Sequence, residues 1–171
     1  MNTVKRLWAP WRVTYVKALD KKSKGCVFCN IRKSKNDKAN YVFFRARHCH
    51  AVLNIYPYNN GHVLIVPNRH VGDLRKLLPE EKKDLFALLE KSQGFLDRVL
   101  SPRGYNIGMN IGRVAGAGFP GHLHIHVVPR WGGDVNFMPV IGNTKVVSQS
   151  LAELYRQLKK CAHAKKSKTS K

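Results

Sequence analysis

Apolar and polar positions divide the middle of the chain into short segments of strand character. Three segments rich in β-branched and aromatic side chains are separated by turn-forming residues, which predicts an antiparallel meander of strands at residues 41–45, 49–54 and 62–67. Two further strands are expected at residues 105–110 and 122–129. They lie on either side of a glycine-rich turn at residues 112–118.

Between these two groups of predicted strands, the apolar residues recur at the spacing of a helix. Pro79, Glu80 and Glu81 provide the proline and the acidic side chains that favour a first helical turn. Apolar residues then recur at helical spacing and predict the longest helix: Leu85, Leu88, Leu89, Leu96, Val99 and Leu100. A second helix is expected at residues 148–160. The pattern therefore predicts an α+β fold, a five-stranded antiparallel sheet with one long and one C-terminal helix.

The length of 171 residues allows one compact core and is too short for two full-sized domains. We expect an irregular, basic N-terminal arm at residues 1–40, a folded domain at residues 41–160 and a disordered basic tail at residues 161–171. Within the arm, residues 7–12 hold two tryptophans, which are expected to pack as an aromatic anchor.

Charge suggests the class of partner. The formal net charge is +21, from 31 Lys and Arg against 10 Asp and Glu, so the chain attracts polyanions such as phosphorylated ligands or nucleic acid. A solvated lysine-rich surface is the alternative interpretation. No apolar run approaches the roughly 20 residues that span a bilayer, and residues 1–17 carry Pro10 and charges where a signal peptide needs apolar residues. We therefore expect a cytoplasmic protein without a membrane partner.

Three histidines alternate with apolar residues in the last predicted strand. Strand geometry places His122, His124 and His126 on one face, about 6–7 Å apart, with the apolar residues between them on the other. Packing does not explain them, because each buried ring nitrogen needs its own partner. A neutral imidazole can attack phosphorus or exchange protons near neutral pH. The same spacing also suits a metal site for some of the three.

This segment resembles the signature of the histidine-triad (HIT) superfamily, in which histidines alternate with apolar residues. The similarity to the superfamily extends to Asn54 and to residues 60–67. Residues 7–12, 26–29 and 129–131 resemble, more narrowly, a bacterial branch akin to the fragile histidine triad and diadenosine tetraphosphate phosphorylase proteins. The resemblance implies an intracellular homodimer that joins two five-stranded sheets into one of ten strands.

The resemblance also implies roles for individual residues. His124 matches a nucleophile that forms a covalent nucleotidyl-histidine, His126 matches a donor to the phosphates and leaving group, and His62 matches a supporting histidine. Asn54 matches a ribose contact and Asn110 matches an amide near the phosphates. The turn with Gly116, Gly118 and Phe119 allows close approach to a phosphate, or is simply a flexible hairpin. Trp131 is interpreted either as stacking on the base or as a structural residue of the core or of a dimer interface. Gly118 and Phe119 replace a Gly-Gln step of the animal-type enzymes, so recognition of the polyphosphate is expected to differ.

Cys26 and Cys29 form a C-x-x-C pair, which in a cytosolic chain indicates a metal or redox pair. Zinc needs two further ligands. Zinc-containing relatives use histidines at the positions matched here by His70 and His122, so the resemblance implies a structural zinc site. A reduced, metal-free thiol pair is the alternative.

The predicted function is that of an enzyme that cleaves a dinucleoside polyphosphate, such as diadenosine tetraphosphate, at the α-phosphate. Water and inorganic phosphate both remain open as acceptors, and magnesium can accompany the substrate. The alternatives are a nucleoside phosphoramidate hydrolase and a basic nucleic-acid-associated protein that binds nucleotides. Affinity for RNA or DNA that falls steeply with salt would favour the last of these.

Overall fold

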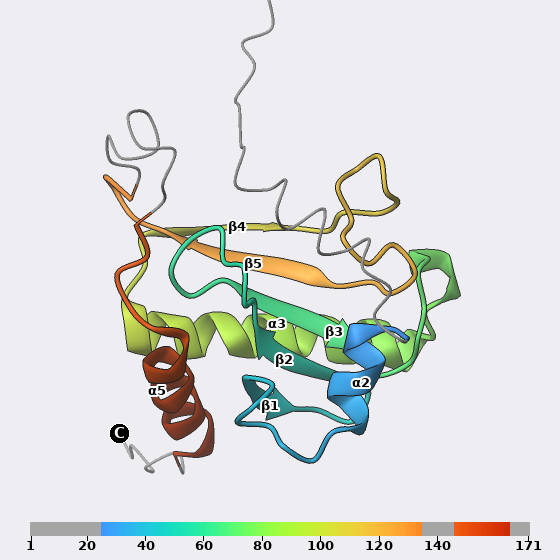
Figure 1. Cartoon of the computed structure of the whole chain (residues 1–171), viewed down its shortest axis with the longest axis horizontal. Helices are drawn as coiled ribbons and strands as arrows, with labels where there is room; N and C mark the ends of the chain where they lie inside the picture. The colour runs from blue at the N-terminus through green and yellow to red at the C-terminus, as the bar shows by residue number, and fades with distance from the viewer. Residues whose placement is uncertain (1–24, 135–145, 165–171) are drawn as a thin grey trace, which may run out of the picture.

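The computed structural model describes residues 25–134 and 146–164. Helices and strands follow one another along the chain as shown in Figure 1. Their bounds are α2 Val27–Lys33, β1 Val42–Arg45, β2 Cys49–Leu53, β3 Val63–Pro67, the 3-10 helix η1 Leu74–Lys76, α3 Pro79–Leu100, β4 Gly104–Gly108, β5 Ile125–Arg130 and α5 Leu151–His163. Two parts of the sequence predictions, the aromatic anchor at residues 7–12 and the tail from residue 165 onward, lie outside the described residues.

The strands form one five-stranded sheet in the order β1-β2-β3-β5-β4, and all neighbouring pairs are antiparallel. The predicted meander corresponds to β1, β2 and β3. Strand β5 then inserts beside β3, and β4 forms the edge. The α+β prediction is thereby confirmed.

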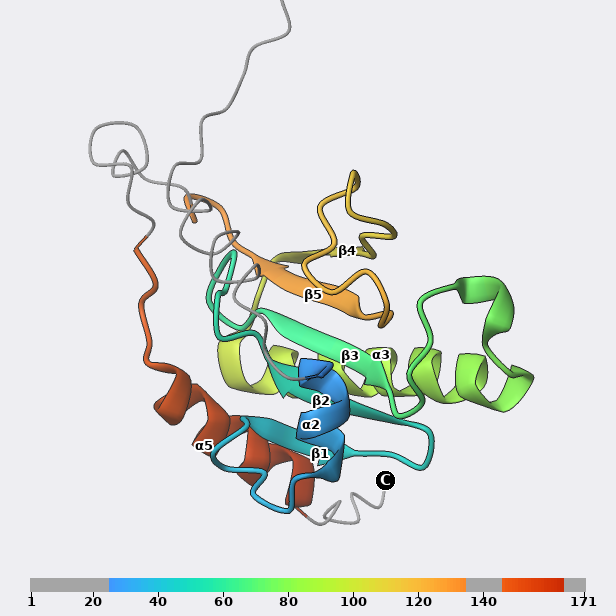
Figure 2. The same ribbon diagram turned by 45° about the vertical axis from the view of Figure 1, so that its right-hand side comes forward.

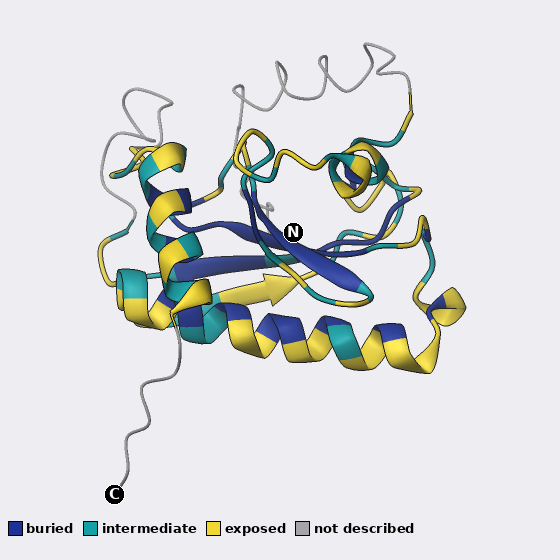
Figure 3. Ribbon diagram, turned by 90° about the horizontal axis from the view of Figure 1, so that it is seen from below, coloured by how far each residue is buried: buried dark blue, intermediate teal, exposed yellow. Residues whose placement is uncertain are grey.

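Two hydrophobic cores lie on opposite faces of the sheet. On one face, α3 and α5 pack against alternate strand residues such as Phe43, Leu53 and Ile65. On the other face, Phe28 of α2 packs on Val52 and Leu64. Figures 1 and 2 show α2 in front of the sheet and α3 behind it. Figure 3 shows the buried stripe of α3 turned toward the strands and its exposed side turned away.

Helix α3 begins at Pro79, as predicted. The Glu81 carboxylate accepts the backbone N–H of Leu78 and forms an ion pair with Arg69 at 2.7 Å, which anchors the first turn to the segment after β3. The apolar face of this helix spans the back of β2, β3 and β5. It therefore holds rigid the strands from which the histidines project.

The structure differs from the sequence predictions in the arm and at the ends of several elements; β4, for example, covers Gly104–Gly108 and not residues 105–110. The arm, expected to be irregular, contains α2, because Phe28 has an apolar sheet face to cover. Helix α5 covers Leu151–His163, and its last turn is stabilised where Cys161 and Ala162 pack against the core. The first three residues of the expected tail are therefore helical. Strand β5 begins at Ile125 and not at residue 122.

None of the helices in the described part of the chain combines the length and the apolar character that crossing a bilayer requires.

Candidate active site

The histidine segment crosses from a loop into β5. Leu123, Ile125 and Val127 are buried in the core beneath α3, as their alternation predicted. The three histidines belong to the opposite face, where two of their rings contact Phe28 of α2. His122 precedes the strand because its ring, and not its backbone, binds the carbonyl of Pro67 on β3, with Nε2 at 2.9 Å. The alternation of histidine and apolar side chains between the two faces of the sheet therefore begins before the first residue of β5.

His124 is held in one tautomer. Its Nδ1–H donates to the backbone carbonyl of His122 at 2.9 Å, so Nε2 keeps its lone pair. The side chain is buried, and burial lowers the pKa of His124 below its ordinary value. The ring is therefore neutral near pH 7, with one nitrogen available for nucleophilic attack.

A chain of hydrogen bonds fixes the next ring. The backbone N–H of Tyr58 donates to Nδ1 of His62 at 3.0 Å, so the proton of His62 lies on Nε2. That Nε2–H donates to Nδ1 of His126 at 2.9 Å, which leaves the His126 proton on Nε2. Burial, reinforced by the neighbouring imidazoles, lowers the pKa of His62 to about 3. A neutral His62 thus orients His126 as a donor.

A cavity of about 300 Å³ lies beside these histidines. Its lining is mostly apolar and comes from α2, from the strands and from the segments around them: Val27, Phe28, Asn30, Ile31, Asn40, Val52, Leu53, Asn54, Ile55, Tyr56, Leu64, Phe119, His124 and His126. A largely apolar hollow with a few polar groups suits a flat, partly polar molecule such as a nucleoside.

The structure brings only some of the predicted substrate contacts to this cavity. Asn54 and Phe119 line it, whereas Asn110, Gly116 and Gly118 are absent from the lining. Trp131 lies at the far end of β5, where its indole N–H donates to the carbonyls of Leu100 and Ser101 at the end of α3. This contact favours the structural interpretation of Trp131 over stacking on a base.

The wall formed by α2 was not predicted. Val27, Phe28 and Ile31 are apolar residues at one-turn spacing and follow directly from Cys26. This spacing was the available signal, but the run of seven residues is too short to identify a helix from sequence.

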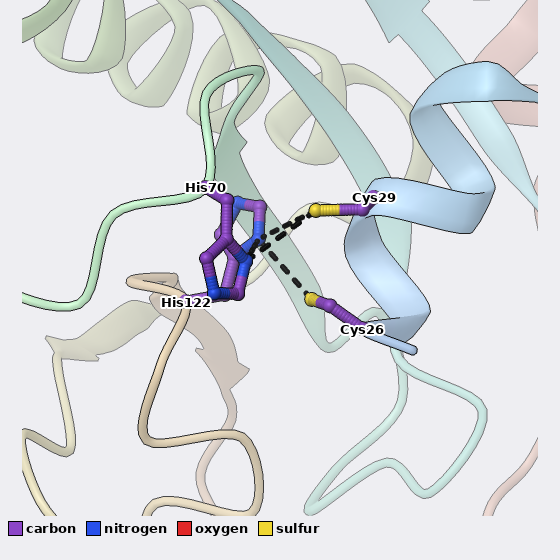
Figure 4. Close-up of side chains that lie close together, drawn as sticks. All are labelled: Cys26, Cys29, His70 and His122. Carbon is purple, nitrogen blue, oxygen red and sulfur yellow. Dashed lines mark hydrogen bonds between the residues drawn. The ribbon is translucent and has the colours of Figure 1, made fainter. Parts of the chain in front are cut away.

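Cys26, Cys29, His70 and His122 form one cluster, in which one ligand atom from each residue lies within 4.8 Å of the others. Figure 4 shows the two thiols of α2 pointing at the two imidazoles. The neighbouring distances run from 3.3 Å, for Cys26 Sγ to His122 Nδ1 and for His70 Nδ1 to His122 Nδ1, to 3.7 Å for Cys29 Sγ to His122 Nδ1.

The donor set fits a tetrahedral metal. A tetrahedron with Zn–N near 2.0 Å and Zn–S near 2.3 Å has edges of about 3.3–3.8 Å. Since Nε2 of His122 donates to the Pro67 carbonyl, its Nδ1 presents a lone pair to the cluster. The four residues named from the sequence therefore form a group that could hold a metal ion.

The comparisons with known proteins agree with this geometry. The family described as the HIT domain matches residues 35–133. An AP-4-A phosphorylase of Mycobacterium tuberculosis is 40% identical over 92% of this chain and 84% of its own length. An asymmetrical bis(5'-nucleosyl)-tetraphosphatase of Schizosaccharomyces pombe is 39% identical over 57% of this chain and 53% of its own length.

A solved structure is also similar. A zinc-bound histidine triad family protein from Mycobacterium smegmatis superimposes with a TM-score of 0.64 at 27% identity, covering 82% of this chain and 94% of that protein.

Proposed function

Because this chain belongs to the HIT domain family, we propose that it is an enzyme that cleaves dinucleoside polyphosphates at the α-phosphate. The tautomer of His124 is the observation that carries this proposal, since its bare Nε2 belongs to a ring that lines the cavity. The names of the relatives, an AP-4-A phosphorylase and a bis(5'-nucleosyl)-tetraphosphatase, support this class of substrate.

In the first step, His124 Nε2 attacks the α-phosphorus. A P–N bond forms, the P–O bond to the leaving nucleotide breaks, and that nucleotide departs with the bonding electrons. The imidazole becomes cationic but keeps its Nδ1–H on the His122 carbonyl, which stabilises the positive charge. His126 donates its Nε2–H as a hydrogen bond to the phosphate and leaving-group oxygens. His62 acts only by orienting His126.

In the second step, an acceptor oxygen attacks the same phosphorus. The P–N bond breaks, and its electrons return to His124 Nε2. Water as acceptor gives hydrolysis and loses a proton to solvent, whereas inorganic phosphate gives a nucleoside diphosphate. The apolar cavity holds the nucleoside, and Asn54 contacts its ribose. Magnesium can bind the polyphosphate without touching the nucleophile.

Zinc is the metal we propose for the Cys26, Cys29, His70 and His122 cluster, since two thiolates and two imidazoles are ligands that zinc prefers. The ion would connect Cys26 and Cys29, at the start of α2, to the histidines beside the sheet, and it would have a structural role and no part in the reaction. The similar zinc-bound protein supports this choice. We also propose a homodimer joined along β4, one of the two edge strands, where Ile107 is 45% exposed.

The test combines one variant with product analysis. His124→Asn should fold normally, form no nucleotidyl adduct and lose cleavage of diadenosine tetraphosphate by at least about 10³-fold. His163→Asn, at the exposed end of α5, is the matched control and should behave as wild type. Intact-mass measurement after a neutral quench detects the acid-labile adduct.

Products measured with and without inorganic phosphate identify the acceptor. ADP plus ATP indicates phosphorolysis and AMP plus ATP indicates hydrolysis, whereas two ADP molecules would place the cleavage at a β-phosphate and contradict attack on the α-phosphorus. Full turnover by His124→Asn would overturn the proposal.

A further inference from the structure

One row of side chains runs across the sheet beneath the cavity. Val42 pairs with Val52, Val52 with Leu64, and Leu64 with His126, so the four residues stand at one level on β1, β2, β3 and β5. Three strand spacings separate the ends of the row, about 14 Å. With the α-phosphate at the histidines, a nucleoside lying along this row points its base toward the start of β1.

Asn40 lies at that end, two residues before β1, and lines the cavity. The apolar side chains of α2 form the wall above the row, so a base in this position is held mainly by burial. Such contacts do not distinguish one purine from another. Discrimination must come from the few polar groups of the lining.

The two other side-chain amides in the lining, Asn30 and Asn54, are poorly placed for this role. The Asn54 amide lies at the histidine end of the row, where its oxygen accepts the Tyr56 backbone N–H at 2.9 Å and its nitrogen lies 3.3 Å from Nδ1 of His62, so it is placed for the proposed ribose contact and not for the base. Asn30 is exposed on α2, where water can replace any contact with the base.

The Asn40 amide has a fixed orientation. Its Nδ2 hydrogens donate to the Ser34 hydroxyl at 2.9 Å and to the backbone carbonyl of Asn36 at 2.8 Å. A backbone carbonyl only accepts, so the nitrogen must face it and the amide cannot flip. The group left to meet a ligand is the oxygen Oδ1, an acceptor.

The backbone around Asn40 is also held tightly. Its N–H donates to the Asn36 carbonyl, and the next residue, Tyr41, has a φ of 54°, a left-handed conformation that is costly for an aromatic residue. Such a conformation persists only where surrounding contacts enforce it. Here the N–H of Tyr41 donates to Lys38 and its carbonyl accepts from Leu53.

We propose that Asn40 reads the nucleobase, with Oδ1 accepting a hydrogen bond from the exocyclic amine of a 6-aminopurine. A 6-oxopurine places a carbonyl at the same position, so two acceptors face each other and both lose a partner. The site therefore selects adenine over guanine or hypoxanthine. This inference rests on the proposed function, because it requires the nucleotide to lie with its phosphate at His124.

The experiment compares diadenosine tetraphosphate with diinosine tetraphosphate, which differs at the 6-position amine and at the protonation of the neighbouring ring nitrogen. Wild-type protein should favour the adenine substrate by about 10-fold or more in kcat/KM. Asn40→Ala should lose about 10-fold on the adenine substrate and stay within about 2-fold on the hypoxanthine substrate, so that the preference disappears.

Ser34→Ala is the matched control. It removes one loop partner of Asn40 and leaves the carbonyl oxygen in place, so the adenine preference should persist. Equal loss on both substrates in Asn40→Ala, or a preference abolished equally by Ser34→Ala, would mean that only loop packing matters and would overturn the inference.

The wild-type ratio distinguishes this inference from the proposed function without any variant. Equal cleavage of the two substrates contradicts base reading and leaves the enzyme assignment intact. Cleavage of neither substrate contradicts the proposed function itself.

Discussion

The backbone carbonyl of His122 accepts the Nδ1 proton of His124 at 2.9 Å, while the ring of the same His122 belongs to the cysteine–histidine cluster. One residue therefore connects the metal-binding group to the candidate nucleophile. Phe28, on the helix that begins just after Cys26 and carries Cys29, packs against the rings of His122 and His124 at centroid distances of 5.3 and 5.0 Å. The cluster thus holds both the nucleophile and the α2 wall of the cavity.

Removal of the metal should therefore weaken activity as well as stability. We expect the double variant Cys26→Ser, Cys29→Ser to lose bound zinc, to unfold at lower temperature and to lose about 10- to 100-fold in kcat/KM, because the support for His124 and α2 is gone. Metal analysis, thermal unfolding and steady-state kinetics measure the three effects. Cys161→Ser is the control for zinc content and kinetics, since Cys161 lies on α5 away from the cluster. Wild-type protein purified without metal yet fully active would contradict this prediction.

His62 should act on catalysis through His126. His62→Leu removes the donor to His126 Nδ1, so the rings can reorient, and we expect kcat to fall about 10²-fold with a smaller change in KM. His62→Gln offers an amide N–H at a similar position and should recover part of the loss. Equal effects of the two variants on kcat would show that the hydrogen bond is irrelevant to the reaction.

The rate of adduct formation should report the ionisation of His124. Burial lowers the pKa of this imidazole, and only the neutral ring attacks, so the rate should fall with acid and the midpoint of that fall should lie below pH 6.5, the ordinary histidine value. Single-turnover formation of the nucleotidyl adduct avoids the ionisation of the acceptor. A midpoint above pH 6.5 would contradict the assignment.

Acid should destabilise the fold through His50, which is fully buried on β2 and donates from Nδ1 to Asn68. Burial lowers its pKa to about 4. The unfolded chain, with a histidine pKa near 6.5, takes up the proton first, so this contribution is complete above pH 6.5 and is lost as pH falls from 6.5 to about 4. Urea unfolding across this range should show a smaller pH dependence in His50→Gln than in wild type. An unchanged slope would exclude His50 as a cause.

The turn before His62 should tolerate no side chain at Gly61. Its φ is +77°, and an added Cβ would lie 2.5 Å from Leu100 Cδ1 and 3.0 Å from Pro129 Cγ. Gly61→Ala should cost about 1–3 kcal/mol of unfolding free energy, from backbone strain and overpacking together. Gly104→Ala is the matched comparison, because nothing lies within 4 Å of its added methyl group and its φ is not positive. Denaturant unfolding of the two variants should differ by at least about 1 kcal/mol.

Local patterns in the sequence were sufficient for the strands, the long helix and the apolar–histidine alternation. A period of two places Leu123, Ile125 and Val127 on one face whatever the rest of the chain does. The helical spacing of the leucines in α3 likewise places them on one face of the helix. Boundaries were less certain, because the start of β5 depends on whether the Pro67 carbonyl binds a backbone N–H or the His122 ring.

Convergence of distant segments depended on the tertiary structure. The sequence by itself indicated that Cys26 and Cys29 form a metal or redox pair and that histidines suited to attack phosphorus project from one strand face. Only the fold decided that α2 covers the cavity, that the Asn36 carbonyl fixes the Asn40 amide nitrogen and that Trp131 binds the end of α3. The physical reason is that these arrangements depend on which backbone carbonyls and apolar faces remain unsatisfied after the sheet has assembled, and no local period encodes that information.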